Sequence, residues 1–294
     1  MLVQEKLQTT LHVRKLSPHI GAEITGVDLR QPVDGETKAL LNRAILENVC
    51  MVIRDQHFTP EEFARVAELF GEVQDQDHPK YSFPGLPTIK RHSNYNLDPA
   101  GNRIKEGLHW HTDGAFRDQP PKFTMLYAVE LPDAGGNTNA GGNTNVVNMR
   151  AAYRSLPEEL RQKVDAMRTN NVRMGSKARY RVNTNNVAIM AQGGQVANQH
   201  PLVRSIDDTG EKGVWFNPNT VENIIGMDPE ESQNFLYDLM DKLIRPEFTY
   251  SHQWRLGDLF TWDNRSSMHK VNFDYDWNQH RLHYHATTRG ERPH

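Results

Sequence analysis

The sequence predicts a mainly β fold with helices (α+β): a double-stranded β-helix, or jelly roll, flanked by helices. Short β-rich runs separated by Gly, Pro and Asn turns recur along the chain, and amphipathic segments with helical spacing interrupt them. The only internal repeat is six residues long, too short for a solenoid. The 294 residues fit one large β-rich domain, so we expect a single domain over residues 1–294.

The N-terminal half supplies strands that alternate with capped helices. Strands are expected at 11–34 (several short ones with turns), 49–54 and 123–131, and helices at 34–48, 59–70, 148–153 and 156–167. The second of these helices has an N-cap threonine, Thr59, followed by Pro60 and two acids. Residues 72–108 are expected to form loops because Pro, Asn and Gly are frequent there.

The C-terminal half continues this pattern, with the helices expected at one end of the jelly roll. Strands are expected at 200–203, 213–216, 248–254, 259–263 and 280–289, and a helix capped by Asp228 is expected at 228–243. Residues 168–200 are rich in Asn, Arg and Gly and have weak periodicity. We therefore interpret 168–200 as a lid or insert.

Composition excludes several classes of partner. The net charge is −3 and no basic block occurs, so nucleic acid is not an expected partner and a small molecule is. The N-terminus lacks a signal-peptide pattern, and no apolar run approaches the roughly 18 residues of a spanning helix, so no membrane association is expected. The single cysteine, Cys50, favours a reducing, cytoplasmic compartment.

The segment 108–116, Leu-His-Trp-His-Thr-Asp-Gly-Ala-Phe, is the strongest candidate for a functional site. In an extended strand His111 and Asp113 lie on the same face, as two ligands of a metal would. His109 shares that face and is a rival ligand. One carboxylate and two imidazoles would leave three positions open on ferrous iron, and six of the fourteen histidines follow residue 250.

Several separated motifs, in order, resemble those of the taurine dioxygenase and 2,4-dichlorophenoxyacetate dioxygenase family. These motifs are His111-Thr112-Asp113, a Gly-Gly-Asn-Thr loop, Trp262-Asp263-Asn264-Arg265 leading to His269, and Arg281. The likeness begins near Gly21 and covers most of the chain. It implies an oxygenase that depends on Fe(II) and 2-oxoglutarate and consumes dioxygen.

The resemblance assigns His111, Asp113 and His269 as iron ligands and gives His109 a supporting role. It assigns Arg281 to the distal carboxylate of 2-oxoglutarate, which a guanidinium fork suits well. A threonine of the Gly-Gly-Asn-Thr loop normally assists this arginine, and the tandem copies 134–139 and 140–145 offer two candidates, Thr138 and Thr144. We favour Thr138, because its loop directly ends the strand that leads from the metal ligands.

Substrate contacts are expected from three further positions. His78 and Tyr81 match a histidine and a tyrosine of the family's substrate pocket. His285 stands where taurine dioxygenase has an arginine that holds the sulfonate, which argues against a simple alkylsulfonate. A basic cluster in the expected lid could add an anion contact: Arg173, Lys177, Arg179 and Arg181.

The predicted function is therefore hydroxylation of a small organic acid or related metabolite, with release of succinate and carbon dioxide. Desaturation or cyclisation at the same iron centre is the first alternative, and halogenation is disfavoured because Asp113 keeps its carboxylate. A metal- or metabolite-binding jelly roll without catalysis is the second alternative. By analogy with the family we expect a homo-oligomer.

Overall fold

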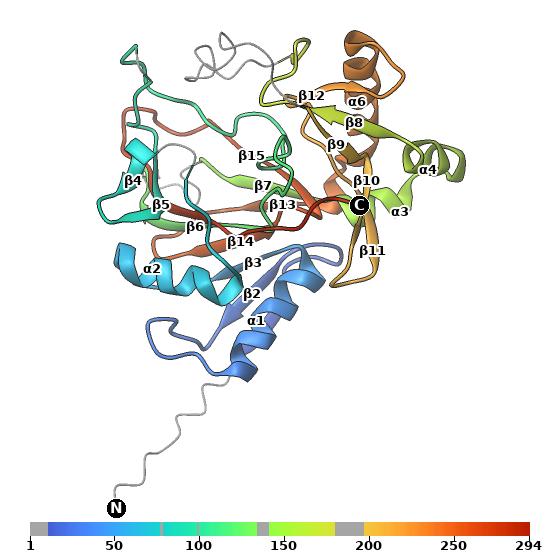
Figure 1. Ribbon diagram of the computed structural model, residues 1–294. Helices are drawn as coiled ribbons and strands as arrows, with labels where there is room; N and C mark the ends of the chain where they lie inside the picture. The colour runs from blue at the N-terminus through green and yellow to red at the C-terminus, as the bar shows by residue number, and fades with distance from the viewer. Residues whose placement is uncertain (1–10, 77–78, 99, 134–140, 180–196) are drawn as a thin grey trace, which may run out of the picture.

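A computed structural model describes residues 11–76, 79–98, 100–133, 141–179 and 197–294. Within these residues the strands form one large sheet and three small ones. The main sheet consists, in spatial order, of β1 (His12–Lys15), β2 (Ala22–Thr25), β3 (Cys50–Ile53), β14 (Leu259–Asp263), β6 (Phe123–Glu130), β16 (Leu282–Thr287), β5 (Leu86–Ser93) and β4 (Ser82–Phe83). The sheet that faces it consists of β13 (Thr249–His252), β7 (Thr144–Asn148) and β15 (Ser267–Val271). The expected jelly roll is confirmed (Figure 1).

Two further small sheets lie beside the jelly roll. One is the hairpin of β10 (Val203–Ile206) and β11 (Glu211–Val214), and the other is β12 (Val221–Ile224), β8 (Arg168–Asn171) and β9 (Asn198–Pro201). The helices are α1 (Gly35–Asn48), α2 (Pro60–Ala67), α3 (Met149–Ser155), α4 (Glu158–Asp165) and α6 (Pro229–Leu243), with short 3-10 turns η1 (Glu68–Phe70), η2 (Pro79–Tyr81) and η3 (Pro246–Phe248). No helix among the described residues is long and apolar enough to span a membrane.

Alternation along the strands of the main sheet produces two apolar layers. On β3, Met51 and Ile53 pack into the layer between the main sheet and helices α1 and α2. Cys50 and Val52 pack into the layer between the main sheet and the small sheet that faces it. Successive strand residues face opposite sides, and both sides are covered here, so the strand is apolar throughout. The thiol of Cys50 is therefore buried as a small apolar group.

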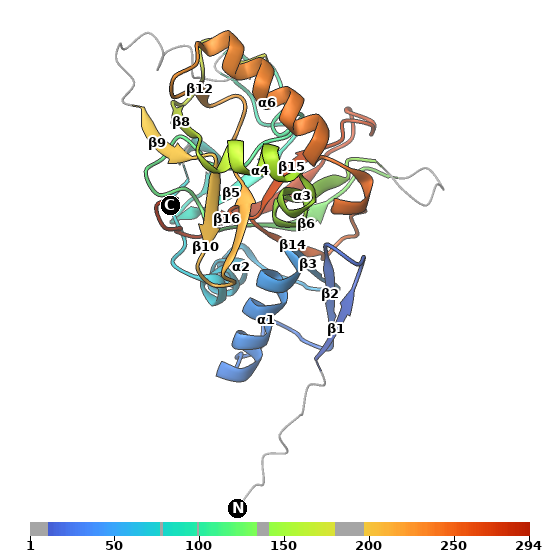
Figure 2. The ribbon, with the colours of Figure 1, turned by 90° about the vertical axis from the view of Figure 1, so that its right-hand side faces the viewer.

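The helices form two groups rather than the single cluster that we expected. Figure 1 shows α1 and α2 beneath the main sheet. Figure 2 shows α3, α4 and α6 close together and above α1 and α2. The second group covers the outer face of the small sheet, where Val147 and Met268 join its core. Sequence periodicity gives the buried face of a helix but not the sheet that it covers, which explains the error.

Local signals placed most helix ends correctly. Asp34 caps α1 by accepting a hydrogen bond from the Thr37 N–H, and Asp228 caps α6 in the same way. At α2, Thr59 and Glu62 exchange the two hydrogen bonds of a capping box. These three helices begin where the sequence predicted.

Five strands were missed, namely β4, β5, β8, β12 and β15, and one expected strand is not regular. Residues 72–108 contain β5, a full strand of the main sheet, and β12 and β15 were not expected either. The ends of the expected lid, 168–200, form β8 and β9, which pair with each other. The segment 108–116 makes only an isolated bridge at His111 and then turns, with Gly114 at φ +59°. A turn with positive φ ends a strand.

Candidate metal centre

Two histidines from distant parts of the chain lie directly opposite each other. His111 and His269 form an isolated antiparallel bridge, in which the His111 N–H donates to the His269 carbonyl (3.0 Å) and the His269 N–H donates to the His111 carbonyl (2.8 Å). Directly opposed residues place their side chains on the same face. The two imidazole centroids are accordingly 4.1 Å apart.

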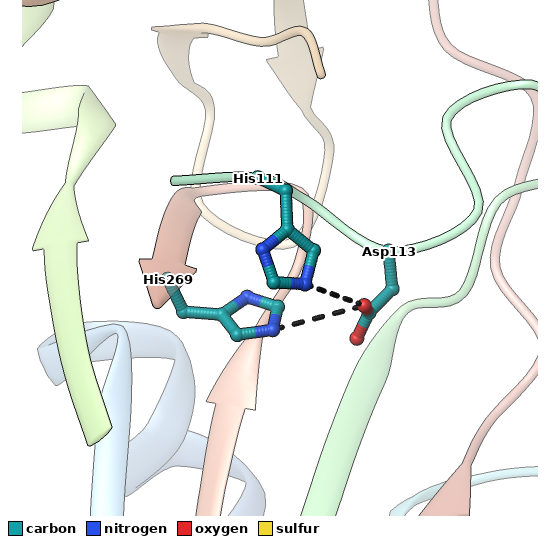
Figure 3. A group of neighbouring side chains, drawn as sticks. All are labelled: His111, Asp113 and His269. Carbon is teal, nitrogen blue, oxygen red and sulfur yellow. Dashed lines mark ion pairs between the residues drawn. The ribbon is translucent and has the colours of Figure 1, made fainter. Parts of the chain in front are cut away.

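Asp113 completes a group of three (Figure 3). Its Oδ1 lies 3.5 Å from His111 Nε2 and 3.7 Å from His269 Nε2. One ligand atom from each of the three residues lies within 4.8 Å of the others. His109 lines the same cavity but does not belong to this group.

The hydrogen bonds around the group leave the right atoms available for a metal ion. His111 Nδ1 lies 2.7 Å from the His109 carbonyl oxygen, which can only accept, so Nδ1 carries the proton and Nε2 keeps its lone pair. The Asp113 Oδ2 accepts from the Thr124 hydroxyl (2.6 Å), and Thr124 in turn accepts from Asn264 Nδ2 (2.7 Å). Oδ1 therefore remains for coordination, and the three residues fit Fe(II).

The protonation states of the three side chains also favour binding of a metal cation. Burial alone would raise the pKa of Asp113, but the adjacent imidazoles of His269 and His111 and the hydrogen bonds outweigh it and hold that pKa far below its usual range. Burial, assisted by His111, lowers the pKa of His269 to about 3, so this imidazole is neutral. The pKa of His111 is raised despite burial, because Asp113 is close, so metal binding here competes with a proton.

Arg281 lies in the same cavity, which has a volume of about 640 Å³. It is 5% exposed, and burial lowers its pKa to about 10, so it stays charged at neutral pH. Within the described residues its side chain forms no ion pair and donates one hydrogen bond, from Nη2 to the Gly142 carbonyl (3.1 Å). Other buried arginines do have carboxylate partners: Arg150 with Glu211, Arg204 with Glu291 and Arg265 with Asp263. A buried cation without a counter-ion is costly, so Arg281 suits an anionic ligand.

The second copy of the tandem repeat lies beside Arg281. Thr144 lines the cavity and accepts a hydrogen bond from the Trp254 indole N–H (3.2 Å). Gly142 has φ +71°, and a Cβ there would lie 3.2 Å from Arg281 Nε, so glycine is required for this close approach. The first copy, residues 134–139 with Thr138, lies outside the described residues, so the structure describes only Thr144 at this cavity.

The three residues expected to contact the substrate differ in their position relative to the cavity. His285 lines the cavity. Tyr81 does not, and its hydroxyl donates to the Leu97 carbonyl (2.8 Å). His78 lies outside the described residues. Of the basic cluster in 168–200, Arg173 lines the cavity, whereas Lys177 pairs with Glu230 (3.7 Å) and Arg179 with Asn234 (3.1 Å); Arg181 is not described.

Several cavity residues were missed by sequence reasoning. Thr124 and Asn264 hold Asp113, and Lys90, His92 and Glu106 form a polar cluster on the wall of the cavity. Asn264 could have been found, because it belongs to the Trp-Asp-Asn-Arg motif. Lys90 and His92 alternate on β5, a signal that was lost when this segment was taken as a loop.

A jelly roll that brings two imidazoles and one carboxylate together, beside a buried arginine with no acidic partner among the described residues, defines a class: the 2-oxoglutarate-dependent non-haem iron dioxygenases. The chain belongs to the taurine catabolism dioxygenase TauD, TfdA family, whose profile matches residues 12–288.

Individual relatives agree over nearly the whole chain. The alkylsulfatase of Acinetobacter baylyi is 30% identical over 288 residues, which cover 96% of this chain and 86% of that one. The alpha-ketoglutarate-dependent 2,4-dichlorophenoxyacetate dioxygenase of Cupriavidus pinatubonensis is 26% identical, covering 87% and 90%. The crystal structure of AAD-2 in complex with Mn(II) and N-oxalylglycine has a TM-score of 0.78 and 28% identity, covering 97% and 99%.

Proposed function

We propose that this enzyme oxidises an unactivated C–H bond of a small organic acid or related metabolite, with hydroxylation as the outcome. 2-Oxoglutarate and dioxygen would be consumed, and succinate and carbon dioxide released. The observation that carries this proposal is that one cavity holds both the three-residue metal group and a buried arginine for which the described part of the chain supplies no carboxylate.

His111, Asp113 and His269 would hold Fe(II) through Nε2, Oδ1 and Nε2 and leave positions for the cosubstrate and dioxygen. When bound, the iron supplies the oxidative chemistry that no side chain can perform. The chain's own task is to place the reactants: the Thr124 hydroxyl fixes the Asp113 carboxylate, and the bridge between His111 and His269 fixes both imidazoles.

Arg281 would bind the distal carboxylate of 2-oxoglutarate with Thr144 beside it. The indole of Trp254 occupies a lone pair of the Thr144 oxygen, so the hydroxyl proton of Thr144 remains available to a carboxylate. The guanidinium and the hydroxyl together would orient the cosubstrate toward the metal.

The charge of the cavity supports an acidic substrate. Seven basic and four acidic side chains line it, although the whole chain carries −3. The basic ones are Lys90, Arg103, Lys105, Arg117, Arg173, Lys270 and Arg281, and the acidic ones are Asp75, Asp98, Glu106 and Asp113. A cationic cavity in an acidic protein concentrates anions.

The test is turnover of reconstituted protein. Anaerobically purified protein with Fe(II) and 2-oxoglutarate should release succinate when air is admitted, and a screen of organic acids by oxygen uptake, with mass spectrometry of the product, should identify the substrate. Binding of 2-oxoglutarate without oxygen consumption would instead identify a metabolite sensor. A dehydrogenated or ring-closed product would identify desaturation or cyclisation.

We also propose that residues 1–294 act as one dioxygenase domain and that 168–200 serves as its lid. The span of the family match, residues 12–288, supports the first point. The position of Arg173 at the cavity supports the second. A homo-oligomeric state and a cytoplasmic location stay predictions.

A further inference from the structure

A polar cluster on the wall of the cavity is not used by the proposed metal and cosubstrate sites. β5 and β16 pair in register, with Lys90 opposite His285 and His92 opposite His283. Lys90, His92 and His285 line the cavity, and the rings of His92 and His285 lie 6.2 Å apart. Of these residues, His285 was expected to contact the substrate, and His92 was not.

The protonation of His285 follows from its neighbour Gln76. The Gln76 Nε2 donates to the Thr88 carbonyl (2.8 Å), which fixes the orientation of the amide. The Gln76 Oε1 therefore faces His285 Nδ1, at 2.9 Å, and can only accept. The proton of His285 must lie on Nδ1, and its Nε2 carries a lone pair.

The protonation of His92 follows from Glu106 in the same way. The Glu106 carboxylate lies 3.2 Å from His92 Nδ1, and Lys90 contributes to holding its pKa well below the usual range. An ionised carboxylate only accepts, so His92 also carries its proton on Nδ1 and a lone pair on Nε2. Burial lowers the pKa of both imidazoles, that of His285 to about 3, so neither becomes a cation at neutral pH.

Lys90 does not offset these two acceptors. Its ammonium lies 2.6 Å from the same Glu106 oxygen, so its charge is already neutralised. Neither His92 Nε2 nor His285 Nε2 has a hydrogen-bond partner among the residues that the structure describes. Two lone pairs therefore line this wall, and an oxyanion placed against them would be repelled.

We propose that His92 and His285 form a substrate subsite that accepts hydrogen bonds through both Nε2 atoms, so that the end of the substrate bound there carries a hydroxyl or amino group rather than an oxyanion. This inference rests on the proposed function and narrows its substrate class. The acidic group of the substrate would lie elsewhere in the cavity, and the class is that of hydroxy or amino acids.

The tautomers can be measured directly. Nitrogen NMR of the full-length, zinc-loaded protein with labelled histidine should show protonated Nδ1 and unprotonated Nε2 for both residues, with the signals assigned by their loss in His92→Phe and His285→Phe. A proton on Nε2 of either residue, or an imidazolium at pH 7, would overturn the proposal.

Matched ligands test the consequence. Calorimetry on zinc- and 2-oxoglutarate-loaded protein should show 6-hydroxyhexanoate and 6-aminohexanoate binding at least about tenfold more tightly than hexanedioate, which replaces the donor by a second carboxylate. Equal affinities, a reversed order or no binding of any of the three would contradict the subsite.

Variants should change this preference in a known direction. Glu106→Gln frees the Lys90 charge, and His285→Arg introduces a guanidinium, so each should shift the preference toward hexanedioate by about tenfold. Glu72→Gln, at a surface ion pair with Arg289, is the matched control and should leave it unchanged. An unchanged preference in both Glu106→Gln and His285→Arg would also overturn the proposal.

Failure of this inference can be distinguished from failure of the proposed function. Binding of 2-oxoglutarate and its slow turnover to succinate without substrate should persist in the control Glu72→Gln, which lies outside the cavity. Their loss in the unmodified, iron-loaded protein would contradict the proposed function instead.

Discussion

Two buried cations in one cavity have opposite surroundings. Arg281 is 5% exposed and has no carboxylate partner in the described part of the chain, whereas Lys90 is 9% exposed and lies 2.6 Å from Glu106. The charge of Arg281 is thus available to a ligand, and that of Lys90 is not. The number of cations sets how strongly this cavity attracts anions overall, whereas the place at which an anion binds depends on which of those cations lack counter-ions.

The cavity thus has two ends. The cosubstrate end contains the metal group, Arg281 and Thr144. The substrate end contains Lys90, His92, Glu106 and His285. Changes at the first end should abolish or weaken every turnover. Changes at the second should alter only the choice of substrate.

The largest effect is expected at the metal group. His111→Ala or Asp113→Ala should abolish Fe(II) binding and reduce succinate release to background, because two ligands cannot hold the ion. Metal content and succinate are measured after anaerobic reconstitution. Full turnover in both variants would remove the metal assignment.

Arg281→Lys should weaken 2-oxoglutarate binding about a hundredfold, because a single ammonium cannot replace the guanidinium fork in a buried site. The matched control is the double variant Lys90→Met/Glu106→Gln, which removes the other cation together with its partner. It should leave 2-oxoglutarate affinity, measured by calorimetry, within about twofold. Equal losses of 2-oxoglutarate affinity in the two variants would show that Arg281 and Lys90 do not serve different ligands.

Thr124→Val should weaken divalent metal binding about 10- to 100-fold, because Asp113 would lose the hydrogen bond that fixes its second oxygen. Thr261→Val on β14 is the control, since the buried Thr261 hydroxyl has no hydrogen-bond partner among the described residues. Titration with Mn(II) followed by electron paramagnetic resonance gives the affinities. Identical affinities in the two variants would show that Thr124 does not position the carboxylate.

Thr144→Val should weaken 2-oxoglutarate binding about tenfold, the effect of one lost hydrogen bond to a charged group. Trp254→Phe should have a smaller effect, because the hydroxyl remains but loses the indole that orients it. Calorimetry measures both. A loss in Thr138→Val with no loss in Thr144→Val would instead assign the role to the first copy of the repeat.

The smallest effect concerns acid stability. An unfolded histidine has a pKa of about 6.5, whereas that of His285 in the folded protein is lowered to about 3 by burial and by Lys90 and His92. Between these values the unfolded chain binds more protons, so His285 should reduce stability as the pH falls through this window. Urea unfolding at pH 7 and pH 5 should therefore show a smaller acid loss in His285→Gln than in the unmodified protein.

Prediction from sequence succeeded where a local pattern carries the information. His111 and Asp113 are two residues apart, and the caps at Asp34 and Thr59 are contiguous signals, so each could be found without knowing the fold. A regular strand was expected to bring His111 and Asp113 together, and the segment instead forms a bridge followed by a turn. The bridge and turn also place the two side chains close to each other.

Prediction failed where an inward-facing strand carries polar residues. β5 alternates, but its inward positions include Lys90 and His92 because they face a cavity and not an apolar core, so the hydrophobic pattern of a strand is missing. The partners Thr124 and Glu106 reach their sites only through tertiary contacts. Such residues carry no signal in the sequence around them.

The tandem copies have a consequence for genetics. Residues 134–139 and 140–145 are identical, so removing either copy yields one and the same protein, with a single threonine at both spacings that the family uses. Deletion of either six-residue copy is therefore expected to leave the activity unchanged. The double replacement Thr138→Val/Thr144→Val removes both candidate hydroxyls and should weaken 2-oxoglutarate binding at least as much as Thr144→Val alone.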